Sequence, residues 1–297
     1  MGYSKTKTTV LAIAGFVCVA GLVVWQSLYT RSKTESVSIP SPRIVSLAPN
    51  LTEILFALGL EDHITAVTDN CDYPPAAAEK HRVGSFWQPD LESILAARPD
   101  ILIALDIPQH RPIVSRLEQS GCTCLSLRIE TLEHLMPTIQ EIASVTGRIK
   151  EGGILIQDID MRLKSFSSDP DKVRPKILWV VQRDPLRVAG TRTFINQLLN
   201  LAGGINAIGP TLYEYPPIGA EELLAAVPDI IIEPSEMTDS SERNSQVNFW
   251  SHYSSLPAVR NDRLYLIPSG LVSRLGPRIP DAVAVIANCI QSPAAQP

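Results

Sequence analysis

Arginines and aromatic residues are the side chains of this sequence best suited to recognising a bound molecule. Arg183, Arg187 and Arg192 follow a predicted strand at 176–181. Guanidinium groups can hold a phosphate or a carboxylate through paired hydrogen bonds. These three residues therefore predict a site after this strand that holds an anion. The alternative is that they are ordinary surface arginines.

Several aromatic residues are candidates for contact with a ligand. Tyr73 belongs to the Pro-rich segment DYPP (72–75), Phe86 and Trp87 are adjacent, and Phe249 and Trp250 follow a polar stretch at 236–248. A flat ring with a polar tip suits a large, semi-polar ligand. For each residue the alternative is packing inside a domain or over its edge.

The motifs of common enzymes and metal sites are missing from the sequence. It contains no G-x-S-x-G elbow, no G-x-G-x-x-G after a strand and no P-loop. Cys122 and Cys124 form a C-x-C pair without the second pair that a zinc site needs, and the five histidines have no metal-type spacing. We therefore expect neither an enzyme nor a metal site, although distant histidines that converge are an alternative. The pairing of any disulfide is open.

Length and charge narrow the class of protein further. The 297 residues suit two α/β domains, and the hydrophobic fraction of 45% is enough for real cores. The net charge is −5, without a stripe of Lys and Arg in the body of the chain. A nucleic-acid partner is therefore not expected.

The N-terminal segment, residues 1–41, differs in composition from the rest. Lys5 and Lys7 precede an uncharged run at 8–30, which Arg31 and Lys33 close. Residues 10–28 are long enough to cross a bilayer as a helix, so we expect a membrane anchor followed by a polar tether at 31–41. A cleaved signal peptide or a lipoprotein site at Cys18 are the alternatives. All three predict an exported body.

An internal repeat indicates the architecture of that body. ESILAARPDILI at 92–103 matches EELLAAVPDIII at 221–232, with a constant offset of 129 residues and eight of twelve positions identical. Each copy predicts a short helix that ends before a proline, followed by a strand buried on both faces. A predicted strand and helix also precede each copy.

The repeat predicts two similar α/β lobes joined by one long helix. We expect the lobes at 42–132 and 170–297 and the connecting helix at 133–169, interrupted at Gly152 and Gly153 because glycine disfavours a helix interior. A single connection leaves a cleft between two lobes, and such clefts are favoured ligand sites.

With these residues in view, the chain resembles the class III substrate-binding proteins of ABC importers, which carry cobalamin, iron-siderophores or haem. The motifs that carry the resemblance are RIVSLAPNLTE (43–53), TDNCDYPP (68–75), VG (83–84), PDLESI (89–94) and GPR (276–278). The segment DYPP is similar to the cobalamin branch in particular.

The resemblance implies roles for individual residues. Tyr73, Phe86 and Arg274 are implied to face the ligand, and Glu92 and Glu221 to dock on arginines of the permease dimer, whose two-fold symmetry suits a repeat-related pair. Together with the arguments above, the candidate ligand-binding residues are Tyr73, Phe86, Trp87, Arg183, Trp250 and Arg274. The local alternative for each glutamate is its favourable place in a helix's first turn.

Three positions depart from the family pattern. Val181 replaces an aromatic residue, Gly270 replaces an acidic ligand contact near Arg274, and Ala202 replaces a cysteine that pairs near the C-terminus, which leaves Cys289 without that partner. These departures concern the identity of the ligand.

The resemblance implies a periplasmic or extracytoplasmic receptor, anchored by its N-terminal helix, that delivers cobalamin or a related corrinoid to a permease with its ATPase subunits. The resemblance implies that this receptor has no cofactor of its own. An iron-siderophore or haem receptor of the same fold is the first alternative. A membrane-tethered structural protein without a ligand is the second.

Overall fold

The computed structural model describes residues 42–166, 173–236 and 239–292. The expected anchor at 10–28, Cys18 and the tether lie outside the described residues. Within the described residues, no helix is long and apolar enough to cross a membrane. The described residues belong to one compact unit, Pro42–Pro297.

The first lobe is built on a sheet of five parallel strands in the order β3-β2-β1-β4-β5. Residues of β1 and β4 are almost completely buried, as the continuous apolar runs predict. The strands are β1 (Ile44–Ser46), β2 (Ile64–Val67), β3 (His81–Arg82), β4 (Ile101–Leu105) and β5 (Thr123–Leu127). The α-helices are α2 (Pro49–Ala57), α3 (Pro75–Ala78), α4 (Leu91–Ala96) and α5 (Arg111–Glu118), and the 3-10 helix η1 (Glu61–His63) precedes β2.

The second lobe has a separate sheet, in the order β10-β9-β6-β7, with β8 paired to β6. Its pairings are parallel except that of β6 with β7, which is antiparallel and has no counterpart in the first lobe. The strands are β6 (Lys176–Arg183), β7 (Leu186–Val188), β8 (Ile205–Asn206), β9 (Ile230–Ser235) and β10 (Leu264–Pro268). The helices are α8 (Phe194–Leu201), α9 (Ala220–Ala226), α10 (Ser240–Ser251), α11 (Pro257–Arg260), α12 (Ser269–Val272) and α13 (Ile279–Gln291). The two-lobed α/β architecture is thus confirmed.

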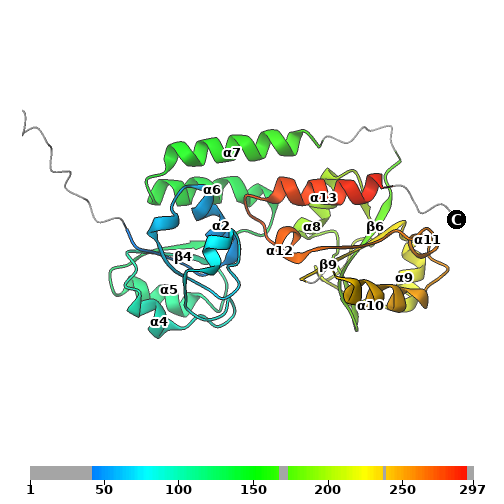
Figure 1. Ribbon diagram of the computed structural model, residues 1–297, viewed down its shortest axis with the longest axis horizontal. Helices are drawn as coiled ribbons and strands as arrows, with labels where there is room; N and C mark the ends of the chain where they lie inside the picture. The colour runs from blue at the N-terminus through cyan, green and yellow to red at the C-terminus, as the bar shows by residue number, and fades with distance from the viewer. Residues whose placement is uncertain (1–41, 167–172, 237–238, 293–297) are drawn as a thin grey trace, which may run out of the picture. The chain divides into compact units, whose positions relative to one another are not determined.

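The connection between the lobes differs from the single long helix expected from the sequence. Two helices, α6 (Leu132–Val145) and α7 (Ile149–Lys164), lie side by side (Figure 1). The chain turns at Gly147, whose φ of +71° favours glycine, and not at Gly152 and Gly153. Gly152 serves a different purpose: a Cβ there would come within 2.5 Å of the Cβ of Ala143. It allows α6 and α7 to pack closely.

One hydrophobic core continues from the first lobe into the second. It includes Leu51 of α2, Ile139 of α6, Ile159 of α7, Leu198 of α8 and Val283 of α13, each 3% exposed or less. Because α6 and α7 share this core with both lobes, they determine how the two sheets face each other.

Candidate functional site

A cavity of about 510 Å³ lies between the two lobes. Its first-lobe wall comes from loops at the carboxyl ends of the parallel strands, where ligands of open α/β sheets usually bind. The second lobe contributes the start of α8 and the segments that follow β9 and β10. The lining residues are Pro49, Asn50, Asn70, Phe86, Trp87, Leu105, Ile129, Phe194, Glu236, Ser269, Gly270, Ser273, Arg274 and Leu275.

Phe86 and Trp87 form an aromatic wall of this cavity. Their rings meet edge to face with centroids 4.7 Å apart, and Trp87 is 62% exposed. The loop that carries them begins at Gly84, whose φ is +84° and where a Cβ would lie 2.7 Å from the carbonyl oxygen of Gln88. Glycine is therefore needed to fold the loop back toward Pro89, with which it forms a β-bridge.

Arg274 lines the cavity with a guanidinium group that already has partners. Its Nη1 donates to Asp72 at 2.5 Å and to Glu53 at 3.4 Å, and its Nη2 donates to the carbonyl oxygen of Asn70 at 3.1 Å. Burial alone would lower the pKa of Arg274, but the hydrogen bonds and charges of Asp72 and Glu53 raise it. The charge of Arg274 is thus balanced by two carboxylates of the first lobe.

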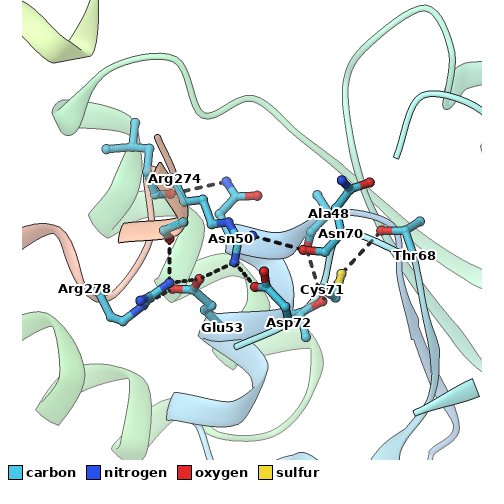
Figure 2. Close-up of polar contacts among 12 residues, drawn as sticks. Ala48, Asn50, Glu53, Thr68, Asn70, Cys71, Asp72, Arg274 and Arg278 are labelled. Atoms are coloured by element: carbon cyan, nitrogen blue, oxygen red, sulfur yellow. Dashed lines mark hydrogen bonds and ion pairs between the residues drawn. The ribbon is translucent and has the colours of Figure 1, made fainter. Parts of the chain in front are cut away.

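Glu53 is the centre of this group, which we call the inter-lobe cluster and define as Glu53, Asp72, Arg274 and Arg278 (Figure 2). Arg278 donates to both carboxylate oxygens of Glu53, from Nε at 2.9 Å and from Nη2 at 2.5 Å. Glu53 is only 4% exposed. The cluster therefore joins α2 of the first lobe to the segment between α12 and α13 of the second lobe. The connection is a buried, bidentate ion pair between Glu53 and Arg278.

Tyr73 lies away from the cavity. The guanidinium carbon of Arg278 stands 3.7 Å above the centre of its ring, a cation–π contact. Both residues line a different groove of about 530 Å³, together with Phe56, Pro74 and Pro277. The structure thus separates Tyr73 from Phe86 and Trp87, with which the sequence grouped it.

Arg183 and Trp250 belong to a second group of polar contacts, the second-lobe cluster, which we define as Arg183, Glu233, Glu242, Gln246 and Trp250. Arg183 donates to Glu233 at 2.6 Å and to Glu242 at 2.8 Å, so its guanidinium is occupied. Trp250 is 0% exposed and donates from its indole nitrogen to Glu233. In this arrangement neither side chain faces the cavity between the lobes.

Glu92 and Glu221 have equivalent places in the two lobes. Each is the second residue of its helix, α4 or α9, and each is exposed. Asp90 caps α4 by accepting from the backbone N–H groups of Glu92 and Ser93. The repeat therefore presents one exposed carboxylate at the same point of each lobe.

The departures from the family pattern also have structural counterparts. Gly270 lines the cavity, and a Cβ there would lie 3.7 Å from the guanidinium of Arg274. Val181 is half exposed at the end of β6, beside Arg183. Cys71, Cys122, Cys124 and Cys289 are free thiols among the residues that the structure describes.

Sequence reasoning missed several cavity residues, among them Asn50, Asn70, Phe194 and Glu236. A usable signal existed, because Asn50 follows β1, Asn70 follows β2 and Glu236 follows β9 directly. A rule that searched the carboxyl ends of predicted parallel strands would have found these three. In the described part of the chain, no group of three or more His, Cys, Asp or Glu residues could hold a metal ion.

Comparison with known proteins defines the class to which this fold and cleft belong. The periplasmic binding protein family matches residues 44–271, and the chain is a member of that family.

Individual relatives are similar over most of their length. The chain is 26% identical over 254 residues to a vitamin B12-binding protein of Vibrio cholerae, covering 85% of this chain and 90% of that protein. The crystal structure of the periplasmic vitamin B12 binding protein of Vibrio cholerae superposes with a TM-score of 0.73 and 26% identity, covering 85% of this chain and 97% of that one. A periplasmic haem-binding protein from Pseudomonas aeruginosa reaches a TM-score of 0.73 with 27% identity, covering 83% and 91%.

Proposed function

We propose that this protein is the substrate-binding component of an ABC importer and that it holds cobalamin or a related corrinoid in the cleft between its lobes. The observation that carries the proposal is the cavity of about 510 Å³ with an aromatic wall and a charge-balanced arginine. Phe86, Trp87 and Arg274 are the proposed ligand contacts. The protein binds its ligand reversibly and leaves it chemically unchanged.

The residues of the cavity favour a corrinoid over haem. Haem iron is commonly held by His, Cys, Met or Tyr. Among the described residues that line the cavity, none is of these four types. A corrinoid brings its own axial ligand and presents amide groups, which Asn50, Asn70 and Ser273 can meet with hydrogen bonds.

The charges of the cavity point the same way. Arg274 is the one cationic side chain among the described lining residues, and Glu53 and Asp72 balance it. Glu236 adds a negative charge. The propionates of haem and the carboxylates of many ferric siderophores would therefore find no unpaired cation, whereas a corrinoid without net negative charge needs none.

The proposed place of the protein is the extracytoplasmic side of the cytoplasmic membrane, anchored by its N-terminal segment. There it delivers its ligand to a permease dimer with ATPase subunits. Glu92 and Glu221 are the proposed docking residues, because equivalent exposed carboxylates on two similar lobes suit arginines related by a two-fold axis.

Calorimetric titration of the detergent-solubilised full-length protein tests the ligand. We expect saturable binding of cyanocobalamin and none of haemin or a ferric siderophore. Trp87→Ala should weaken cyanocobalamin binding at least tenfold. Met161→Ala is the matched control, because Met161 is 65% exposed on α7 and lies outside the cavity. Saturable binding of haemin alone would establish the haem alternative, and binding of none of the three would contradict an import receptor for these ligands.

Charge reversal tests the docking residues. Glu92→Arg combined with Glu221→Arg should abolish uptake of radiolabelled cyanocobalamin by cells while leaving its affinity for the protein intact. The control pair is Glu118→Arg with Glu141→Arg, which changes the net charge equally on exposed helix positions. Normal uptake with the first pair would refute the assignment.

A further inference from the structure

We propose that His110 is a positioning residue that holds the aromatic wall, Phe86 and Trp87, in the orientation that receives the ligand. The ligand in this inference rests on the proposed function. The contacts that His110 makes with the wall do not depend on it. His110 is 0% exposed and lies behind the wall, immediately before α5. It does not line the cavity itself.

The two ring nitrogens of His110 have different partners. Nδ1 lies 3.3 Å from the backbone nitrogen of Leu105, which donates to it, so Nδ1 carries no proton. The proton of the neutral ring is therefore on Nε2, which donates to the carbonyl oxygen of Phe86 at 2.9 Å. Both partners, Leu105 and Phe86, line the cavity. His110 thus ties the end of β4 to the loop that carries the wall.

The backbone of Phe86 is held from both sides. Its carbonyl accepts from His110, and its N–H donates to the side-chain oxygen of Asn70 at 3.2 Å. The side-chain rings are also in contact, from the buried imidazole to the exposed indole. The ring centroids of His110 and Phe86 are 5.3 Å apart and those of Phe86 and Trp87 are 4.7 Å apart, and both pairs meet edge to face. The orientation of the exposed Trp87 therefore depends on a series of contacts that begins at a buried imidazole.

A simpler role for His110, capping the helix that follows it, is not what the contacts show. His110 is the N-cap residue of α5, yet its side chain makes no capping hydrogen bond. The imidazole is instead directed to a loop 24 residues earlier in the chain. Its Nε2 donates to the wall of the cleft, and its Nδ1 accepts from the end of β4.

Three substitutions separate the two hydrogen bonds. His110→Gln can place an amide N–H near the position of Nε2, and so keep the bond to Phe86. His110→Asn can place an oxygen near Nδ1, and so keep only the bond from Leu105. His110→Phe removes both while preserving a ring. Gln and Asn each lose one bond, so the two variants form a pair with a similar expected loss of stability.

We expect His110→Asn and His110→Phe to raise the dissociation rate of cyanocobalamin about three- to tenfold, the factor that corresponds to one net hydrogen bond. His110→Gln should stay within about twofold of the wild type. In a background that lacks both rings of the wall, Phe86→Ala with Trp87→Ala, His110→Asn should add no further change, because His110 acts by orienting those rings. Equal effects of Gln and Asn, or full additivity in that background, would overturn the proposal.

A measurement made without ligand tests the role of His110 independently of the proposed function. The full-length protein labelled with 5-fluorotryptophan gives a ¹⁹F signal for Trp87, which Trp87→Phe identifies. We expect this signal to move toward that of free 5-fluorotryptophan in the Asn and Phe variants, and not in the Gln variant. The signals of buried Trp179 and Trp250 should remain in place. An unmoved Trp87 signal in all variants refutes the role of His110, whereas a wild type that binds no corrinoid refutes only the proposed ligand.

Discussion

The inter-lobe cluster and the second-lobe cluster are built from the same chemistry and do different work. Glu53 is 4% exposed and accepts from Arg274 and Arg278; Glu233 is 5% exposed and accepts from Arg183, Gln246 and Trp250. In each cluster a carboxylate that would be costly to bury alone is matched by donors: two arginines for Glu53, and one arginine with two neutral side chains for Glu233.

The difference lies in what each carboxylate connects. Glu233 of β9 is joined to Gln246 and Trp250 of α10 and thus fixes a helix on its own sheet. Glu53 joins two lobes through residues more than 200 positions apart, and one of its partners, Arg274, lines the cavity. A buried ion pair is therefore no marker of a binding site by itself. Its place relative to the cleft decides its role.

The largest expected effect is on stability alone. Glu233→Ala should lower the free energy of unfolding by about 3–5 kcal/mol, because it leaves the largely buried Arg183 with only one of its two carboxylates. The affinity of the folded protein for its ligand should not change. Urea unfolding and ligand titration check the two expectations.

A matched control for this change is Glu242→Ala, in the same cluster. The Glu242 side chain is 28% exposed, and its loss leaves the bond between Arg183 and Glu233 in place. We expect a loss of about 1 kcal/mol. If Glu233→Ala cost no more than Glu242→Ala, the buried carboxylate would not be the centre of the cluster.

An intermediate effect should reach both stability and binding. Glu53→Gln keeps the shape of the side chain but removes the charge shared by Arg274 and Arg278. We expect a loss of about 3 kcal/mol, at the low end for a broken buried pair because Arg274 retains Asp72. Ligand affinity should fall as well, since Arg274 loses one of the carboxylates that hold it at the cavity. If affinity stayed unchanged, the two clusters would be equivalent and the comparison would fail.

The smallest effect should depend on pH. The hydrogen bond from Arg274, aided by its charge, lowers the pKa of Asp72 below its usual 3.8. A carboxyl group whose pKa is lower in the folded state contributes stability that is complete above the unfolded pKa and is lost as pH falls through the folded one. Stability should thus decrease from about pH 4 downward, and Asp72→Asn should show less of this decrease. Thermal melts of both proteins between about pH 2 and 6 measure the difference. Parallel curves would show that Asp72 does not contribute to the loss of stability at low pH.

The repeat made the two lobes predictable, and the motif around Gly84 led to Phe86 and Trp87. What the sequence could not reveal were partners distant along the chain. Trp250 follows a polar stretch and suggested a cleft aromatic, but the carboxylate of Glu233, 17 residues earlier, accepts its indole N–H and buries it. Tyr73 lies in a different groove, where its ring is stacked against Arg278, a residue of the other lobe. The domain boundaries and the docking role of Glu92 and Glu221 stay predictions.

The close contact of α6 and α7 at Gly152 has a mechanical consequence. From Gly152, α7 runs ten residues to Arg162, which pairs with Asp281 of α13, a span of about 15 Å. A helix of that length is stiff, so a methyl group added at Gly152 should push against Ala143 and shift the far end of α7, which holds α13. The spacing of the two lobes around the cavity therefore depends in part on the lack of a side chain at Gly152, a residue that does not line the cavity itself.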